Sequence, residues 1–320
     1  MKKPLIILTG PTAVGKTSLS IQLAKALNGE IISADSMQVY RYMDIGSAKV
    51  TAAEMAGVPH HLIDVLEPSE PFNVTRFQQM AKTAMTEIYG RGHLPVVVGG
   101  TGFYIQALLY DINFTENDGD GTIRLELERL GAEMGNEYLH GILQEVDPAA
   151  ALAIHANNRK RVIRAIEFYR LTGQPISRHN EAEREKSSTY QFFYYVLNCD
   201  RARLYERIDR RVELMLEQGL VAEVKKLKAM GCTRDMVAMQ GLGYKEILDY
   251  LDGTCSLEDA VYVLKRDTRH FAKRQITWFR REREVRWLNL EEFDFDQEQI
   301  LSYILKQVRE EGNNGITGDI

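Results

Sequence analysis

The fold of this chain is decided by eight residues, Gly10-Pro11-Thr12-Ala13-Val14-Gly15-Lys16-Thr17. They fit the pattern G-x-x-x-x-G-K-[ST], in which backbone N–H groups, the lysine and the hydroxyl together hold a polyphosphate. An apolar run at residues 5–9 precedes the loop and predicts a buried strand, and residues 18–27 follow with the apolar spacing of a helix. This context favours a true phosphate-binding loop over a chance glycine-rich turn.

Each residue type in the loop has a chemical purpose. Gly10 and Gly15 allow backbone amides to approach the phosphates, and the following helix adds the partial positive charge of its N-terminus. Lys16 adds a point charge, and the Thr17 hydroxyl is expected to be a ligand of Mg²⁺. The loop therefore predicts phosphate binding without indicating which phosphate compound is bound.

Length and composition bound the remaining possibilities. A chain of 320 residues predicts about two domains, and a net charge of −5 restricts any nucleic-acid site to a local patch. Cys199, Cys232 and Cys255 lack C-x-x-C spacing, which favours free thiols in a reducing cytoplasm and argues against zinc. We expect neither a signal peptide nor a membrane span.

Strand and helix patterns alternate in the first part of the chain. Strands are predicted at residues 30–34 and 94–98, with a weaker candidate at 62–66, and a helix is predicted between them. This alternation predicts an α/β fold with a P-loop, doubly wound parallel sheet. Ligands of such sheets bind beyond the carboxyl ends of the strands, where the phosphate loop, Asp35 and Thr101 are expected to meet.

The pattern changes near residue 115. An acidic linker is predicted at residues 116–121, after which residues 123–146 and 148–171 have helical spacing with no strand between them. Strand character returns at residues 192–197. These patterns predict an all-helical insertion domain over residues 115–189.

The rest of the chain is expected to form one catalytic core. It combines residues 1–114 with residues 190–310, on either side of the insertion. Residues 311–320 are rich in Gly and Asn and are expected to be a disordered tail.

Two helices concentrate arginine and lysine. Within residues 158–170, four cations stand near a helix start and oppose its macrodipole: Arg159, Lys160, Arg161 and Arg164. An anionic partner and a solvated basic face explain this pattern about equally well.

In the second helix, Arg203, Arg207 and Arg211 recur every four residues and could face the phosphate loop. The alternative is a solvated helix whose arginines are neutralised by neighbouring acids, namely Glu206, Asp209 and Glu213.

The strongest local charge lies at residues 265–286. Nine Lys or Arg residues face three acids there, an excess of six positive charges. Phe271, Trp278 and Phe279 are interleaved with them, as expected of a polyanion contact with rings available for stacking. Core packing is the alternative for the rings, and it is the favoured interpretation for Trp278.

The chain resembles the bacterial tRNA dimethylallyltransferases, also called tRNA isopentenyltransferases, along nearly its whole length. Beyond the phosphate loop and residues 161–173, the matching stretches are Ser33-Ala34-Asp35-Ser36-Met37-Gln38-Val39-Tyr40, Asp44-Ile45-Gly46-Ser47-Ala48-Lys49, His60-His61-Leu62-Ile63-Asp64, Gly99-Gly100-Thr101-Gly102, Gly243-Tyr244-Lys245-Glu246 and Ala272-Lys273-Arg274-Gln275. The phosphate loop alone is common, whereas its spacing to the stretch at residues 35–40 and then to Gly99-Gly100-Thr101-Gly102 is specific. Ser47 stands where the family more often has Thr, and the Cys/His zinc module of the eukaryotic enzymes is not seen.

The resemblance implies transfer of a dimethylallyl group from dimethylallyl diphosphate to N6 of the adenosine beside the anticodon, with Mg²⁺. The catalytic residues are then expected to be Asp35, Thr101, Lys16 and Arg207, and the loop residues 10–17 with Arg211 are expected to hold the diphosphate. The residues expected to contact the tRNA anticodon stem-loop are Asp35, Ser36, Met37, Gln38, Thr101, Arg124, Arg159, Lys160, Arg161, Arg164, Gly243, Tyr244, Lys273, Arg274 and Gln275. We expect a cytoplasmic monomer that binds no zinc.

The chemistry of the residues agrees with this expectation. A departing diphosphate needs cations, and adenine N6 is a poor nucleophile that benefits from a carboxylate able to accept its proton, for which Asp35 is the best placed. The adenine must also leave its stack.

Two other functions remain open. A small-molecule P-loop kinase would use the same loop with ATP but has no use for the cationic residues 265–286. A non-catalytic RNA-binding switch would leave Asp35 and Thr101 unexplained.

Overall fold

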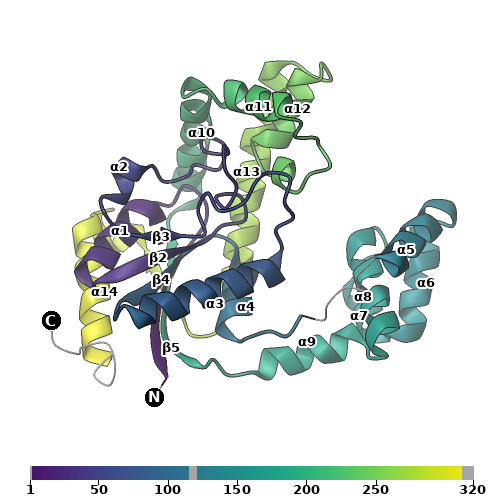
Figure 1. Cartoon of the computed structure of the whole chain (residues 1–320), viewed down its shortest axis with the longest axis horizontal. Helices are drawn as coiled ribbons and strands as arrows, with labels where there is room; N and C mark the ends of the chain where they lie inside the picture. Colours follow the sequence, from purple (N-terminus) through teal and green to yellow (C-terminus); the bar gives the residue numbers. More distant parts are fainter. Residues whose placement is uncertain (1, 115–120, 312–320) are drawn as a thin grey trace. The chain divides into compact units, whose positions relative to one another are not determined.

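The computed structural model describes residues 2–114 and 121–311 (Figure 1). The chain forms two compact units. The first combines Met1–Leu109 with Thr189–Ile320, and the second is Tyr110–Ser188. The expected acidic linker falls almost wholly on residues 115–120, and the expected tail on residues 312–320, both outside the described residues.

The first unit is built on one sheet of six parallel strands, which confirms the predicted fold class. The strands lie in the order β3 (His60–His61), β2 (Gly29–Ala34), β4 (Leu94–Gly99), β1 (Lys3–Thr9), β5 (Tyr190–Asn198) and β6 (Val285–Asn289). After β1 the chain proceeds to β2 on one side, and it returns much later to β5 on the other. The loop that follows β1 therefore lies at the point where the strand order reverses, which is where such sheets bind ligands.

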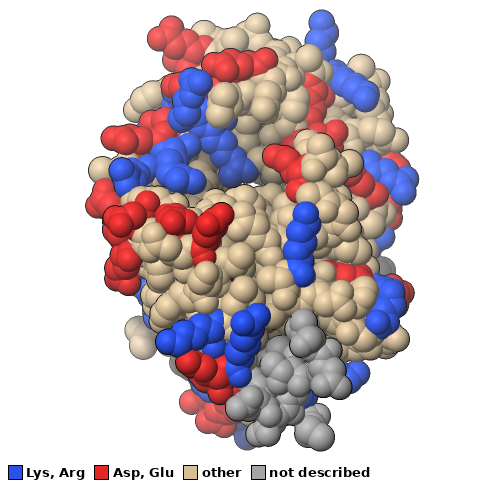
Figure 2. Space-filling model, turned by 90° about the vertical axis from the view of Figure 1, so that its left-hand side faces the viewer, with Lys and Arg blue, Asp and Glu red and all other residues tan. Residues whose placement is uncertain are grey.

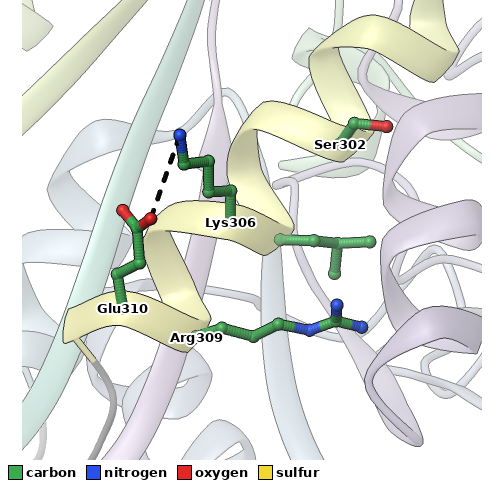
Figure 3. Close-up of a pocket in the computed structure, with 5 residues that line it drawn as sticks. Ser302, Lys306, Arg309 and Glu310 are labelled. Carbon is green, nitrogen blue, oxygen red and sulfur yellow. Dashed lines mark ion pairs between the residues drawn. The ribbon is translucent and has the colours of Figure 1, made fainter.

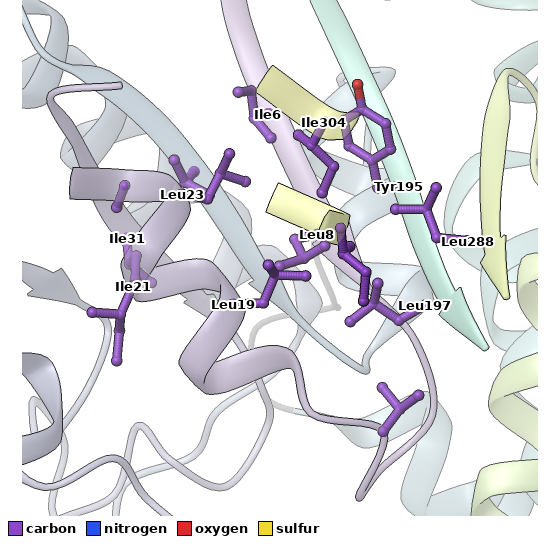
Figure 4. Close-up of a cluster of buried hydrophobic side chains, with 14 of the residues drawn as sticks. Ile6, Leu8, Leu19, Ile21, Leu23, Ile31, Tyr195, Leu197, Leu288 and Ile304 are labelled. Atoms are coloured by element: carbon purple, nitrogen blue, oxygen red, sulfur yellow. The ribbon is translucent and has the colours of Figure 1, made fainter. Parts of the chain in front are cut away.

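Helices cover both faces of this sheet. α1 (Lys16–Ala26) and α14 (Gln297–Glu311) pack on one face, where Ile6 and Leu8 of β1 meet Leu19, Leu23 and Ile304 (Figure 4). α3 (Val74–Gly90) and α4 (Gly102–Leu109) pack together on the other face. Because both faces are covered, β1 reads as a continuous apolar run and not as an alternating one.

Further helices complete the first unit. They are α2 (Ala52–Met55), α10 (Arg201–Glu217), α11 (Leu220–Ala229), α12 (Tyr244–Leu251) and α13 (Leu257–Phe279), with 3₁₀ turns at Ala238–Gln240 and Leu290–Phe293. Asp200 caps α10 and Ser256 caps α13 through side-chain oxygens that accept backbone N–H groups.

The second unit is a bundle of five helices around its own core. The helices are α5 (Thr122–Glu133), α6 (Asn136–Val146), α7 (Pro148–Ala153), α8 (Arg159–Thr172) and α9 (Ile176–Glu185). Leu127, Leu139, Leu143 and Val162 are fully buried at its centre. Asp147 caps α7 and also accepts hydrogen bonds from Ser177, so one carboxylate joins two helices.

Several element boundaries differ from the sequence prediction. The helix expected at residues 123–146 ends at Glu133 and restarts at Asn136, because Gly135 has a φ of +89° that interrupts the helix. The strand expected at residues 62–66 does not form: β3 covers His60–His61 just before it, and Leu66 makes one isolated bridge with Tyr40. β6 was not predicted at all, and Glu311, expected in the tail, is the last residue of α14.

None of the helices formed by residues 2–114 and 121–311 has both the length and the apolar character that crossing a membrane requires.

Candidate active site

The loop between β1 and α1 has a backbone that only certain residues allow. Gly10 has a φ of +147°, and a Cβ there would lie 2.5 Å from the carbonyl oxygen of Leu197 on β5. Gly15 has a φ of +105° and Ala13 one of +65°. A larger residue at Gly10 would therefore push the loop away from the sheet, which explains the glycine of the motif.

Lys16 is held over this loop without a charged partner. Its Nζ donates hydrogen bonds to the carbonyl oxygens of Gly10, at 3.0 Å, and Pro11, at 2.8 Å. Burial and, to a smaller extent, the nearby Arg211 guanidinium lower the pKa of Lys16 to about 7, against the opposite effect of the Asp35 carboxylate. Burial and the like charge of Arg211 thus disfavour the charged ammonium of Lys16, and a bound polyanion would stabilise it.

Thr17 is exposed at the start of α1, and its hydroxyl makes no hydrogen bond to the described residues. Among those residues, no cluster of three or more His, Cys, Asp or Glu could hold a metal ion. A single hydroxyl with phosphate oxygens and water fits Mg²⁺, which is usually bound through substrate phosphates and few protein groups. The donor set thus fits the expected ion only together with a phosphate ligand.

The arginine stripe on α10 divides into two parts. Arg207 donates from Nε to the carbonyl oxygen of Ala13, at 2.8 Å, and Arg211 lies near Lys16 and Asp35 with its pKa lowered by burial. Arg203 does not face the loop, because its guanidinium lies over the Phe295 ring at 4.1 Å.

The neighbouring acids do not neutralise Arg207 or Arg211. Asp209 pairs with Arg269 at 2.5 Å, and Glu213 pairs with Lys265 at 2.9 Å. Glu206 forms no ion pair within the described residues either, so none of the three acids neutralises the two arginines near the loop, although Arg207 itself is exposed to solvent.

Asp35 follows β2 directly and closes a tight turn. Its Oδ1 accepts the N–H of Met37, at 2.8 Å, and that of Gln38, at 3.2 Å. Oδ2 receives no hydrogen bond from any described residue. One oxygen thus orients the carboxylate while the other stays available to accept a proton from a ligand.

Thr101 is connected to the same turn through the backbone. Its N–H donates to the carbonyl oxygen of Ala34, at 3.3 Å, and its own carbonyl accepts the Tyr104 N–H at the start of α4. A Cβ at Gly99 would lie 2.2 Å from the Ala34 oxygen, so glycine is required where the ends of β2 and β4 meet. The structure brings together the phosphate loop, Asp35 and Thr101 as expected from strand order.

The residues after Asp35 have partly structural roles. Gln38 receives a hydrogen bond from Ser33 Oγ, at 3.0 Å, and donates to the carbonyl oxygens of Ser47 and Ala48. Met37 packs against Gly241, where a Cβ would lie 2.7 Å from its sulfur. Ser36 is half-buried and its side chain has no hydrogen-bond partner among the described residues.

Tyr244 corrects one expectation for RNA contact. The residue is fully buried, its hydroxyl donates to Glu223 at 2.9 Å and accepts the Ser47 N–H, and its ring would clash with any side chain at Gly46. Gly243 has a φ of +93° and begins α12. These two residues therefore support the turn at residues 44–47 and do not present a side chain to RNA.

Glu223 was missed by the sequence analysis. Its carboxylate accepts the N–H groups of Asp44, Ile45 and Gly46, at 2.8 to 3.0 Å. A lone glutamate on a predicted helix gives no sequence signal for this, because its partners are backbone groups nearly 180 residues earlier in the chain.

Gln275 also differs from its expected RNA contact. Its side chain is buried and forms hydrogen bonds with the backbone of Thr12 and of Gly100.

The cations of the second unit are of two kinds. Arg124 and Arg164 both pair with the buried Glu167, at 2.7 and 3.1 Å, which gives them a structural partner. Arg159 donates to the carbonyl oxygen of Glu128. Lys160 and Arg161 are exposed and have no ion-pair partner in residues 2–114 and 121–311.

The cationic segment at residues 265–286 is not one surface. Arg286 lies in β6 and pairs with Glu311, and Lys265, Arg266 and Arg269 each pair with an acid of the protein. The solvent-exposed remainder comprises Lys273, Arg274, Arg280, Arg281 and Arg283.

Trp278 packs against Gly102 and meets the Phe103 ring edge-on, with the ring centroids 5.9 Å apart, in agreement with the packing interpretation.

Figure 2 shows one face of the sheet-containing unit, where Lys and Arg side chains gather beside a hollow.

A separate hollow of about 350 Å³ lies along α14 (Figure 3). All of its lining residues belong to that helix: Ser302, Leu305, Lys306, Arg309 and Glu310. Lys306 pairs with Glu310 at 3.9 Å, and no group of the phosphate loop contributes to this hollow. It is therefore not part of the candidate active site.

The fold and the site together define an α/β phosphate-binding enzyme of the P-loop type, with a carboxylate and several cations at the carboxyl end of the sheet. The family model described as IPP transferase matches residues 38–282, and that described as isopentenyl transferase matches residues 3–65. The chain belongs to the IPP transferase family.

Similar proteins extend over nearly the whole chain. A tRNA dimethylallyltransferase of Lachnoclostridium phytofermentans is 61% identical over 308 residues, which are 96% of this chain and 98% of the relative. The crystal structure of a tRNA isopentenylpyrophosphate transferase from Bacillus halodurans is 47% identical, with a TM-score of 0.72 and coverage of 98% and 99%. A eukaryotic dimethylallyltransferase acting on tRNA is 31% identical, with a TM-score of 0.76, and covers 93% of this chain and 77% of that one.

Proposed function

We propose that this protein transfers a dimethylallyl group from dimethylallyl diphosphate to N6 of the adenosine next to the anticodon of a tRNA. The observation that carries this proposal is the position of Asp35. One of its oxygens is fixed by the turn, the other has no protein partner, and Lys16 and Arg211 lie beside it at the carboxyl end of the sheet.

The donor binds through its two phosphates on the loop of residues 10–17. Lys16 and the backbone amides contact the phosphates, and Arg207 and Arg211 add positive charge from α10. Thr17 would hold Mg²⁺, which when bound neutralises developing charge on the departing diphosphate.

The transfer step exchanges one bond for another. The N6 nitrogen forms a bond to the first carbon of the dimethylallyl group, while the bond from that carbon to the diphosphate oxygen breaks and its electron pair leaves with the diphosphate. Asp35 accepts the proton that N6 loses, through its available oxygen. Thr101, joined to the Asp35 turn through Ala34, orients the acceptor.

The tRNA binds through local cationic surfaces, since the chain as a whole is acidic. Lys273 and Arg274 on α13, and Lys160 and Arg161 on α8, are the exposed cations best suited to phosphate contacts. The target adenine leaves its stack to reach Asp35. We place this reaction in the cytoplasm and assign it to a monomer.

The small-molecule kinase has no support in the comparisons, because each of the relatives reported above is a tRNA prenyltransferase. The binding switch does not account for the available oxygen of Asp35. A thermal-shift experiment separates donor from nucleotide, because a ligand raises the melting temperature according to its own affinity. Dimethylallyl diphosphate with Mg²⁺ should stabilise the protein more than ATP at equal concentration.

The decisive experiment incubates the purified protein with radiolabelled dimethylallyl diphosphate, Mg²⁺ and bulk tRNA. Label recovered in an N6-modified adenosine after nuclease digestion supports the proposal. Absence of label in RNA, together with stabilisation by ATP alone, overturns it in favour of the kinase.

A further inference from the structure

A buried glutamine joins the two loops at the carboxyl end of the sheet. Gln275, on α13, is 6% exposed. Its Oε1 accepts the N–H of Thr12 in the phosphate loop at 2.9 Å, and its Nε2 donates to the carbonyl oxygen of Gly100 at 2.9 Å. A side-chain amide supplies both the acceptor and the donor that these two backbone groups need, whereas a carboxylate or an ammonium group supplies only one of them.

The space around this side chain leaves little freedom. A Cβ at Gly100 would lie 2.1 Å from Gln275 Nε2, so glycine is needed there for the amide to reach the backbone. Gly100 directly precedes Thr101, and Thr12 is the third residue of the phosphate loop. The bridge therefore fixes the distance between the loop that holds the diphosphate and the turn that carries Thr101.

The same bridge alters the role of Thr12. Its N–H points to Gln275 and so is not available to a phosphate oxygen. The phosphate loop is thus anchored at its third residue, while the amides nearer Lys16 stay free for the ligand.

The position of Gln275 on α13 also matters. The two preceding residues, Lys273 and Arg274, are exposed, whereas Gln275 and Ala272 are buried. One helix thus presents cations to solvent on one face and holds both active-site loops with the other.

We infer that Gln275 is a positioning residue, which holds the phosphate loop and the Thr101 turn at the separation that prenyl transfer requires. This inference rests on the proposed function. It differs from the RNA contact expected for Gln275, because the amide acts here on the two loops. Its loss affects the rate of the bound complex more than the binding of either substrate.

The test compares Gln275→Met with wild type in the prenyl-transfer assay. Methionine has a similar length and volume but makes neither hydrogen bond. We expect kcat to fall by about 10- to 100-fold, as for a small misplacement of reacting groups, while KM for tRNA and for dimethylallyl diphosphate changes by less than about threefold. Thr277→Ala, an exposed position one turn from Lys273 on α13, is the matched control and should leave kcat and both KM values unchanged.

A second variant guards against misfolding. Gln275→Glu keeps the shape and the acceptor for Thr12 N–H but turns a carboxylate toward the Gly100 carbonyl, so kcat should fall here as well. Wild-type kcat in either folded variant, or a raised KM for tRNA with unchanged kcat, would overturn the inference. An inactive wild-type enzyme would instead refute the proposed function.

Discussion

The two ends of the parallel sheet treat buried charge in opposite ways. At the amino end of β2, Glu30 is only 2% exposed, yet it receives two hydrogen bonds of 2.8 Å from Arg91 and contacts His61 and His93 at 2.6 and 2.7 Å. The hydrogen bonds from Arg91 and from the two histidines lower the pKa of Glu30 to about 2 against the effect of burial.

At the carboxyl end, Lys16 donates hydrogen bonds only to carbonyl oxygens, and a second cation, Arg211, lies near it together with the Asp35 carboxylate. The pKa of Lys16 falls to about 7, so its charged form is disfavoured. The charged form of Glu30, in contrast, is favoured. A buried charge that the protein pairs by itself stabilises the fold, whereas one that it leaves beside a like charge is ready for a ligand. The comparison is in line with the proposed ligand site at the carboxyl end of the sheet.

The largest effect is expected at Asp35. Asp35→Asn keeps an oxygen that can accept the Met37 and Gln38 N–H groups, so the turn survives, but the amide cannot accept a proton. We predict a fall in kcat of ~10²–10⁴ with little change in donor binding. Steady-state kinetics with a parallel thermal shift for dimethylallyl diphosphate measures both, and near-normal turnover would remove Asp35 from the role of proton acceptor.

The matching change at the amino end should affect stability and not catalysis. Glu30→Gln should lower the free energy of unfolding at pH 7 by ~2–3 kcal/mol, because Arg91 and the histidines lose the carboxylate but remain partly solvated. Urea denaturation measures this loss. The temperature shift caused by dimethylallyl diphosphate should be the same in variant and wild type, and a weakened shift would show that the two ends are coupled.

The pH dependence of the Glu30 effect has a definite sign. The pKa of about 2 in the folded protein lies below the unfolded value near ~4.3, so the stabilisation is complete above that value. It is lost as the pH falls from about 4 toward about 2. The stability difference between wild type and Glu30→Gln should therefore shrink on acidification, and a difference that grows would contradict the assignment.

The smallest effect is expected at the exposed cations. Replacing Lys273 and Arg274 by glutamine should weaken tRNA binding and reduce its log–log salt slope by roughly one unit per lost phosphate contact. Lys265→Gln is the matched control. Because Lys265 already pairs with Glu213, this substitution should leave the salt slope unchanged. Equal salt slopes in the wild type, the double variant and Lys265→Gln would mean that Lys273 and Arg274 face solvent and contact no phosphate of the tRNA.

The sequence predicted the parts of the site that local chemistry specifies. The phosphate loop, Asp35 and Thr101 each follow a buried strand, and the carboxyl ends of parallel strands meet at one edge. Their convergence could therefore be inferred before any contact was known.

The remaining contacts depend on partners far away in the chain. Gln275 bonds to residues 12 and 100, and Glu223 bonds to residues 44–46, so neither role leaves a local pattern. Arg286 was counted in the cationic segment at residues 265–286, but it lies in the short edge strand β6 and pairs with Glu311. The charge pattern therefore gave no indication of this strand. Gly135, which interrupts a helical pattern without changing its period, hid the boundary between α5 and α6.

The number of protons taken up when dimethylallyl diphosphate binds is the most direct test of the contrast between the two ends of the sheet. Because the pKa of Lys16 in the ligand-free protein is about 7 and the bound diphosphate favours the ammonium, binding at pH 8 should take up close to ~1 proton, and binding at pH 6 close to none. Calorimetric titrations with Mg²⁺, in two buffers of different ionisation enthalpy, measure this number. Lys16→Arg, which keeps a charge that does not titrate, should abolish the uptake at pH 8. Zero uptake by the wild type at pH 8 would mean that Lys16 is already fully charged without a ligand, and the contrast between the two ends of the sheet would fail.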